Sequence, residues 1–400
     1  MNLDKRKILL IVPRLSRGGQ ERAALRIAAM LCDMFEPVIA TLHTTKNEYD
    51  CPFARHDFAF FRDGLSSFFP LRAVQILFAF LAARRKLRRF VKENDFLLSM
   101  SFGWMANCVN ILSRRKNKVL VSVRNSKDLH FSARFTAFLR HFYRKADLIV
   151  CLSEGIQREM PSVYKLSSDR FVTLYNPFNI EQIKIASNEK PAYNFSSPTI
   201  ASVGRLSEQK GFDVLLHAFC IITKTVPTAR LVLVGGGPLE NKLKALAESL
   251  GVSGAVTFCG VQANPFSILA QCDVFACSSY YEGLSNVIIE AMICGLPVVS
   301  VDCEYGPREI LAPNSDTLSS AKGIELAEYG VLTPRVFVDK GVSEQQHAIV
   351  CLAKAIEKIL SDERTASHYR TQARLRVADF GENVIRERFL AILSTLDIHR

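Results

Sequence analysis

The 400-residue sequence has no hydrophobic run long enough to cross a membrane. Its longest nearly apolar segment, residues 73–83, includes Gln75, whereas a spanning helix needs roughly 20 apolar residues. No small-residue cleavage site follows the short apolar segment 8–13, so this segment predicts a buried strand and not a secretory signal. The 11 cysteines form no C-x-x-C pair, which argues against a zinc cluster or a disulfide framework and favours reduced thiols in a cytosol.

The composition is that of a globular protein, but its charge is unevenly distributed. Hydrophobic residues make up 48% of the chain and charged residues 22%, and the length predicts two domains. Residues 1–178 hold 30 Lys+Arg against 15 Asp+Glu, whereas residues 179–400 hold 21 against 24. The excess positive charge therefore belongs to the first half, which indicates an anionic surface as its partner.

Short apolar runs alternate with amphipathic stretches in both halves, which is typical of βαβ units around parallel sheets. We expect strands at 7–12, 37–42, 96–100, 118–123, 147–152 and 171–174, and at 199–203, 230–234, 255–259, 274–278 and 297–301. The polar segment 179–198, with Pro191 and Pro198, predicts a linker.

We therefore predict an α/β protein of two Rossmann-like domains that face each other across a cleft. The first covers residues 1–178 and the second covers 199–379. Residues 380–400 are expected to form a C-terminal helix that packs back on the first domain.

The first candidate motif is the glycine pair Gly18-Gly19, between the first predicted strand and an apolar-faced helix. Two glycines allow the backbone to turn tightly and to approach a ligand, and free N–H groups at a helix start can bind an anion. The G-x-G-x-x-G spacing of dinucleotide-binding turns is absent here. A plain strand-to-helix turn is the alternative.

The second motif follows the first predicted strand of the second half. Gly204 and Gly211 bracket a loop that contains Arg205 and Lys210. This position is the carboxyl edge of a parallel sheet, where open α/β sheets bind ligands. Two cations there suit a diphosphate. The alternative is a solvated loop that pairs through Glu208.

The third motif, from Glu282 to Glu290, opens a helix expected at 287–293. Ser285 is a candidate N-cap, so the first-turn N–H groups could bind a diphosphate. Glu282 can reach sugar hydroxyls, and Glu290 can accept hydrogen bonds from vicinal ribose hydroxyls. A carboxylate in the early turns of an apolar helix is costly unless it is paired. Two surface glutamates on either side of a cap are the alternative.

Together these motifs resemble glycosyltransferase family 4, which has the GT-B fold. The likeness covers most of the chain and is densest over residues 199–311. It implies a retaining, metal-independent enzyme that moves a sugar from a nucleotide donor to an acceptor. Segments 302–311 and 329–334 resemble bacterial members that add hexoses or N-acetylhexosamines to lipid-linked glycans, lipopolysaccharide or capsule precursors.

The resemblance also implies roles for individual residues. Arg205 and Lys210 would hold the donor diphosphate and stabilise the leaving group, Glu282 would face the donor sugar, and Glu290 would bind the ribose. The donor would also contact Gly18, Gly19, Gly204, Val261, Gly283, Leu284, Ser285 and Asn286. The chain lacks a D-x-D metal–diphosphate motif, so Arg205 and Lys210 would do electrostatically what a metal does elsewhere.

Two positions depart from the family pattern. Many members have a first-domain His near the reacting sugar, where this chain has Arg124-Asn125, with His130 nearby. We assign Arg124 and Asn125 to the acceptor side. Gly236 stands where relatives often have Asp, which puts contacts to the donor base there in doubt.

An apolar segment that begins near Phe68 ends in a cluster of cations. Leu71, Val74, Leu77, Phe78 and Leu81 share one helical face, and the cations that follow are Arg84, Arg85, Lys86, Arg88 and Arg89. This pattern is typical of an interfacial helix on anionic lipid. A core helix with a solvated basic end is the alternative, and no nucleic-acid module accompanies the charge.

We therefore expect a peripheral enzyme on the cytoplasmic face of the inner membrane. Its donor would be a UDP- or GDP-sugar and its acceptor a glycolipid or lipid-linked glycan, with no metal required. A nucleotide-sugar epimerase and a catalytically silent sugar-nucleotide-binding subunit are the alternatives.

Overall fold

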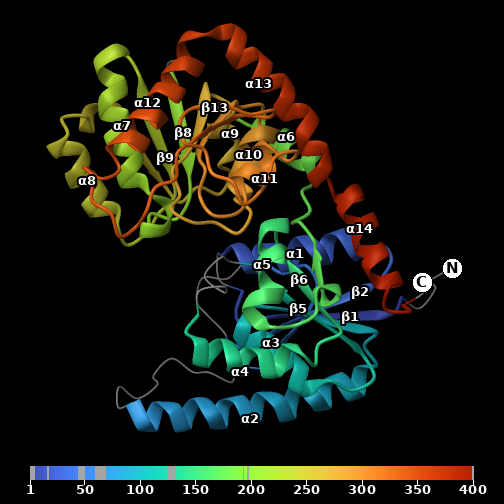
Figure 1. The fold of residues 1–400 in the computed structure, drawn as a ribbon. Coiled ribbons are helices and arrows are strands. Elements are labelled where there is room, and N and C mark those ends of the chain that lie inside the picture. Colours follow the sequence, from blue (N-terminus) through green and yellow to red (C-terminus); the bar gives the residue numbers. More distant parts are fainter. Residues whose placement is uncertain are drawn as a thin grey trace. The chain divides into compact units, whose positions relative to one another are not determined.

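The computed structural model describes residues 5–15, 18–43, 50–58, 69–124, 131–191, 193–195 and 198–398, with the backbone alone over 69–79. The chain divides into two compact units, Met1–Phe178 with Glu382–Arg400, and Asn179–Gly381. Each unit is built on a mainly parallel sheet with helices packed against it (Figure 1).

The described residues of the first unit form a seven-stranded sheet in the order β3-β2-β1-β4-β5-β6-β7, and all its strands are parallel. Its strands are β1 (Lys7–Val12), β2 (Glu36–Thr41), β3 (Ala54–Asp57), β4 (Leu98–Phe102), β5 (Lys118–Val123), β6 (Leu148–Cys151) and β7 (Phe171–Thr173). The central strands are apolar because both faces of a parallel sheet are covered.

The helices of the first unit are α1 (Gly19–Leu31), α2 (Phe69–Asn94), α3 (Trp104–Ser113), α4 (Ala133–Tyr143), α5 (Glu154–Tyr164) and α14 (Glu382–Ser394). Contacts link α2 to α3, α3 to α4 and α4 to α5, so these helices form one continuous layer. Ala83, Leu87 and Val91, at a spacing of four, give α2 a buried face that packs on β1 and β2.

In the part of the second unit that the structure describes, a seven-stranded sheet has the order β10-β9-β8-β11-β12-β14-β13, and only β13 is antiparallel. Its strands are β8 (Thr199–Val203), β9 (Arg230–Val234), β10 (Val256–Gly260), β11 (Val274–Cys277), β12 (Val298–Val301), β13 (Glu325–Leu326) and β14 (Val331–Thr333). Its helices are α6 (Ile180–Ser187), α7 (Phe212–Thr225), α8 (Glu240–Ser249), α9 (Phe266–Leu269), α10 (Asn286–Ile293), α11 (Pro307–Leu311), α12 (Gln346–Ser361) and α13 (Glu363–Arg376).

In both sheets the strand order reverses beside the first strand. The reversal lies between β1 and β4 in the first unit and between β8 and β11 in the second. Loops that leave these strands at their carboxyl ends diverge to opposite faces, and such switch points are where open α/β sheets bind ligands. The two Rossmann-like sheets expected from the sequence are confirmed.

The segment 179–198 is not a linker. Residues of this segment form α6, which begins at the N-cap Asn179 and packs against α9 and α10 of the second unit. The segment is polar not because it is a linker but because α6 is a short surface helix that buries only Ile183.

At the C-terminus, α14 belongs to the first unit. Its Arg386 donates a hydrogen bond from Nε to the Met30 carbonyl at 2.9 Å and pairs with Asp33 at 3.2 Å. Before it, a 3-10 turn over Val377–Phe380 ends at Gly381. The chain thus contributes a helix from its last residues to the unit formed by its first half.

Three strands were missed by the sequence analysis, because none has a long apolar run. The edge strand β3 reads Ala-Arg-His-Asp and is mostly exposed, while β13 and β14 have two and three residues. The strand expected at 96–100 lies two residues later, because Phe96 packs in the core instead. Among the residues that the structure describes, no helix is long and apolar enough to cross a membrane.

Gly235 lies where two loops of the second unit touch. Its φ is +139°, and a Cβ there would lie 1.9 Å from the Gly204 carbonyl oxygen. We therefore expect Gly235→Ala to lower the free energy of unfolding by about 2 kcal/mol or more, as measured by urea unfolding. Gly254→Ala, where no atom lies within 4 Å, is the matched control and should change it little. An equal loss in both variants would contradict the prediction.

Candidate functional site

The loops that follow β8 and β11 are joined by hydrogen bonds at the switch point of the second sheet. Tyr280 N donates to the Gln209 carbonyl at 2.9 Å, and Gln209 Nε2 donates to the Tyr281 carbonyl at 3.0 Å. Ser278 Oγ donates to the carbonyl of Lys210 at 3.1 Å. These three bonds fix the backbone of Lys210 against the end of β11.

Lys210 and Glu282 form a buried ion pair between these two loops. Lys210 Nζ lies 2.6 Å from Glu282 Oε1, and the side chains are only 17% and 8% exposed. Burial alone would lower the pKa of Lys210, but the nearby Glu282 carboxylate outweighs burial and the pKa is raised. Lys210 is therefore a fixed cation at the carboxyl edge of the sheet.

Glu282 is held from three directions. Its Oε1 also accepts a hydrogen bond from Ser279 Oγ at 2.8 Å, and its backbone N donates to the Glu304 carbonyl at 3.3 Å. Within the described part of the chain, no hydrogen bond reaches Oε2. One carboxylate oxygen is thus available to accept a hydrogen bond from a ligand hydroxyl.

The loop that follows β12 packs against the backbone after Glu282. Gly306 has a φ of +89°, and a Cβ there would lie 2.8 Å from the Leu284 Cα. Further along, Arg308 donates to Asp302 from Nε at 2.9 Å and Nη2 at 2.6 Å, and pairs with Glu325 at 2.7 Å. This buried network holds the loop in place.

Ser285 is at the N-cap of α10, but it does not cap the helix as the sequence predicted. Its φ of +61° and ψ of +67° are left-handed, and its side chain makes no capping hydrogen bond. The hydroxyl instead lies 3.8 Å from the Cys277 Sγ. The N–H of Ile288 bonds to the Ser285 carbonyl. The N–H groups of the first turn lie at the N-terminal end of α10, where the helix dipole is positive.

Glu290 is buried in the second turn of α10, while Arg205 is exposed on the loop after β8. Among the described residues, no carboxylate pairs with the Arg205 guanidinium. Val261 is exposed after β10, and a Cβ on Gly236 would lie 3.0 Å from its Cγ2. Val261 therefore borders the loop that follows β9.

The second unit thus brings most of the predicted donor residues to one edge of its sheet. They come from three loops and one helix start, and they are Gly204, Arg205, Lys210, Val261, Glu282, Gly283, Leu284, Ser285, Asn286 and Glu290. Sequence reasoning missed Ser279, which holds Glu282. A polar residue directly after a buried strand was the available signal.

The other predicted site residues lie in the first unit. Gly18 is the N-cap of α1 and Gly19 its first residue, so both follow β1 at the switch point. Arg124 follows β5 and is 6% exposed. Asn125 and His130 lie outside the described residues.

Arg124 is a buried cation with neutral partners. Its Nη1 donates to Ser122 Oγ at 3.1 Å, and its Nη2 donates to Asn176 Oδ1. Burial lowers the pKa of Arg124 to about 9, and no carboxylate among the described residues pairs with it. Sequence reasoning missed Asn176, which follows β7 and is 52 residues from Arg124 in the sequence.

The cations expected to face a membrane occupy two sides of α2. Arg85, Lys86 and Arg89 are exposed, whereas Arg84 and Arg88 are half-buried. The alternative prediction of a core helix is confirmed for one face of α2, because Ala83, Leu87 and Val91 pack in the core. The side chain of Phe78 lies outside the described part.

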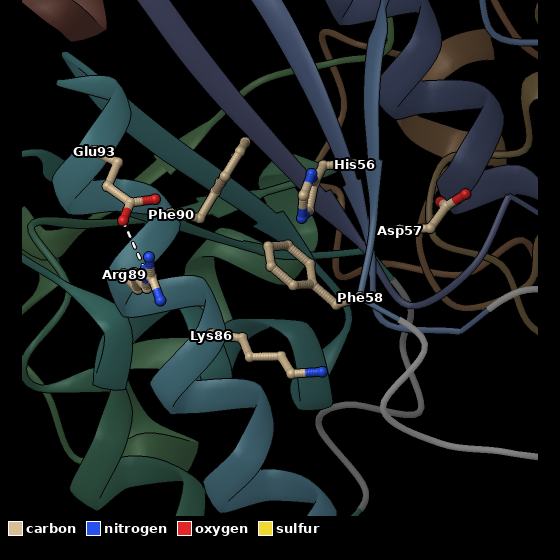
Figure 2. A pocket seen from close by; sticks show the side chains of 7 residues that line it. All are labelled: His56, Asp57, Phe58, Lys86, Arg89, Phe90 and Glu93. Carbon is tan, nitrogen blue, oxygen red and sulfur yellow. Dashed lines mark hydrogen bonds and ion pairs between the residues drawn. The ribbon is translucent and has the colours of Figure 1, made fainter.

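A cavity of about 240 Å³ lies between β3 and the C-terminal half of α2. Figure 2 shows its lining, in which the rings of His56 and Phe90 stack 4.4 Å apart and Arg89 is turned toward Glu93, 2.7 Å away. The cavity is lined by His56, Asp57, Phe58, Lys86, Arg89, Phe90 and Glu93, and so contains no predicted donor residue.

Comparison with known proteins gives two adjoining family matches. The family model described as Glycosyltransferase Family 4 matches residues 17–182, and the model described as Glycosyl transferases group 1 matches residues 184–329. An uncharacterised glycosyltransferase of Methanocaldococcus jannaschii is 31% identical over 295 residues, which are 70% of this chain and 72% of that protein.

Two further matches cover nearly the whole chain. N-acetylgalactosamine-N,N'-diacetylbacillosaminyl-diphospho-undecaprenol 4-alpha-N-acetylgalactosaminyltransferase of Campylobacter jejuni is 25% identical over 380 residues, 94% of this chain and 95% of that protein. The crystal structure of Anabaena Alr3699/HepE in complex with UDP has a TM-score of 0.74 at 20% identity, and covers 97% of this chain and 100% of that one. At this identity the structural match shows the fold.

The burial of the Lys210–Glu282 pair predicts strong coupling. Removing one partner leaves the other charge buried, so we expect Lys210→Met and Glu282→Gln each to lower the free energy of unfolding by about 3 kcal/mol. The double variant should lose clearly less than the sum, as measured by urea unfolding in a double-mutant cycle.

The pair Lys244–Glu240 is the matched control. Its nitrogen and oxygen are 2.7 Å apart, but the side chains are 47% and 35% exposed. We expect a coupling energy below about 1 kcal/mol there, because solvent screens the two charges. Equal coupling in the two pairs would show that burial does not govern the interaction.

Proposed function

The chain is a member of glycosyltransferase family 4 with the GT-B fold, and we propose that it transfers a hexose or N-acetylhexosamine from a UDP- or GDP-sugar to a lipid-linked, lipopolysaccharide or capsule glycan. The observation that carries this proposal is the fixed Lys210–Glu282 pair beside the start of α10. Supporting it, the Campylobacter jejuni relative is named for a diphospho-undecaprenol acceptor, and the Anabaena structure contains UDP.

In the proposed reaction the bond between the sugar and the diphosphate breaks, and negative charge develops on the leaving diphosphate. Lys210 would stabilise this charge from its fixed position, and Arg205 would do so with a guanidinium that pairs with no described carboxylate. The first-turn N–H groups of α10 would contribute further hydrogen bonds. A UDP-sugar is the preferred donor, because the Anabaena neighbour binds UDP.

The remaining donor contacts follow from the positions of the carboxylates. Glu282 would accept a hydrogen bond from a sugar hydroxyl through Oε2, because Oε1 is already held by Lys210 and Ser279. Glu290 would accept hydrogen bonds from the ribose, and the exposed Val261 would border the base. Gly18 and Gly19 would contribute from the first unit.

For the acceptor side we propose Arg124 and Asn125. A buried guanidinium whose described partners are all neutral can bind an anionic group of the acceptor without first breaking an ion pair. Its burial makes an anionic partner favourable, since burial disfavours an unpaired charge.

The proposal includes peripheral binding to the cytoplasmic face of the inner membrane through α2. Its exposed cations Arg85, Lys86 and Arg89 suit anionic lipid headgroups. This arrangement would bring the enzyme to a lipid-linked acceptor.

The proposal is tested by sugar transfer. With labelled UDP- and GDP-sugars and an extract of bacterial lipid-linked glycans, we expect label to enter the lipid fraction with one donor. Arg205→Ala should lower kcat by about 10²-fold or more, because removal of one donor to a developing charge costs this much. Arg374→Ala, another exposed arginine of the second unit, is the matched control and should keep full activity.

Other outcomes distinguish the alternatives. Donor binding in a calorimetric titration without any transfer would favour a silent sugar-nucleotide-binding subunit. Interconversion of the free nucleotide sugar without an acceptor would favour an epimerase.

The resemblance further supports retention of the anomeric configuration and independence of metal ions. If Lys210 and Arg205 stabilise the leaving diphosphate unaided, transfer should persist within about twofold after treatment with excess EDTA. Loss of transfer that added Mg²⁺ or Mn²⁺ restores would contradict metal independence. The anomeric configuration of the product, determined by NMR, tests retention.

A further inference from the structure

A row of aromatic rings runs along α4. Phe135, Phe138 and Phe142 are separated by three and four residues, which places them on one side of the helix, and Phe131, just before the N-cap Ser132, contacts Phe135. Successive ring centroids are 4.9, 5.8 and 4.9 Å apart. Phe138 is 45% exposed and the other three rings are half-buried. We call these four residues the aromatic row.

α4 packs into the first unit mainly through a face other than the aromatic row, although Phe135 of the row also contacts Trp104 of α3. That face is formed by the buried Leu139 and Tyr143. Tyr143 accepts a hydrogen bond from Asn107 of α3 at 3.0 Å and stacks on Tyr164 of α5 at 5.3 Å. The buried anchor of α4 thus does not include Phe138, which is 45% exposed and whose ring contacts are with Phe135 and Phe142 of the same helix.

Trp104, at the start of α3, marks where the row lies. It is the only tryptophan in the chain, and its ring meets that of Phe135 edge to face at 5.2 Å. Its ring is half-buried. The row therefore borders α3, and the contacts from α2 to α3 and from α3 to α4 place all three helices in one layer (Figure 1).

The net positive charge of the chain is concentrated in the segment that contains this layer. Residues 69–146 contain 17 Lys+Arg and only 3 Asp+Glu, and no acidic residue lies between positions 131 and 146. On α4 itself, Arg134 and Arg140 are exposed, as are Arg85 and Arg89 on α2. The exposed ring of Phe138 thus lies on a helix that has exposed arginines and no carboxylate.

We propose that the aromatic row of α4 inserts into the headgroup region of an anionic phospholipid bilayer, while the cations of α2 and α4 bind lipid phosphates. Aromatic rings favour this region because it is apolar on one side and hydrated on the other. Each cation near an anionic bilayer adds about 1 kcal/mol of attraction. The charge excess favours a bilayer over a protein partner, whose surface would have to supply a matching density of acidic groups.

This inference deepens the membrane binding proposed above, which assigned the contact to α2 alone. It predicts an apolar contribution from α4 that salt does not screen. It requires neither the proposed donor nor the proposed acceptor chemistry.

The single tryptophan allows a direct test with the unmodified chain. On addition of vesicles of 30% phosphatidylglycerol and 70% phosphatidylcholine, we expect the Trp104 emission to shift to the blue. Phospholipids brominated near the headgroup end of the acyl chain should quench it. Phe138→Ser should lower the partition coefficient about fivefold, because just under half of this ring is available to enter the bilayer.

Leu375→Ser is the matched control, because Leu375 is 61% exposed on α13 of the second unit. It should leave vesicle binding unchanged. Unaltered binding in Phe138→Ser, or no change of the Trp104 emission in the unmodified chain, would overturn the proposal. So would a change of oligomeric state in Phe138→Ser by light scattering, since the row would then contact a second copy.

Transfer to a detergent-solubilised acceptor separates this proposal from the proposed function. We expect Phe138→Ser to retain that activity. An unmodified chain that binds vesicles through the row but transfers no sugar would refute the proposed function. The proposal of membrane binding through the row would still hold.

Discussion

The buried ion pair between Lys210 and Glu282 is the interaction on which the rest of the candidate site depends. Two opposite charges with little exposure are tolerated only when they neutralise each other. Because one lies in the loop after β8 and the other in the loop after β11, the pair fixes the distance between these loops. The backbone around α10 and the cation beside it are therefore held together, which would suit the proposed diphosphate.

The topology of the sheet explains why this pair can form at all. Strands β8 and β11 are neighbours although 70 residues lie between Val203, which ends β8, and Val274, which begins β11. Their carboxyl ends lie at the same edge of the sheet. Gly235 and Gly306 allow the adjoining loops to approach as closely, because a side chain at either position would collide with backbone atoms. The site thus depends on close backbone contacts as much as on charged side chains.

The first unit is organised around a different constraint, which is its charge. Its helical layer gathers cations without matching carboxylates, and it keeps Arg124 buried beside neutral partners. Both features raise the free energy of the isolated protein through repulsion and desolvation. Both become favourable beside an anion. The proposed lipid surface and the proposed acceptor therefore share one physical basis, because in both an anion would neutralise positive charge of the first unit.

The sequence by itself determined the order of the apolar strands and their alternation with helices. It also determined that Gly204, Arg205, Lys210 and Glu282 follow strands and that Glu290 lies in a helix. These are local properties, because apolar periodicity and glycine placement act over a few residues. It could not give β3 or α6, whose polar residues conceal an edge strand and a short surface helix. Only the tertiary structure decided that Glu282 pairs with Lys210, that the Ser285 side chain leaves α10 uncapped and that Phe138 of α4 remains exposed. Each of these depends on groups from different elements meeting in space, and no sequence spacing encodes that distance.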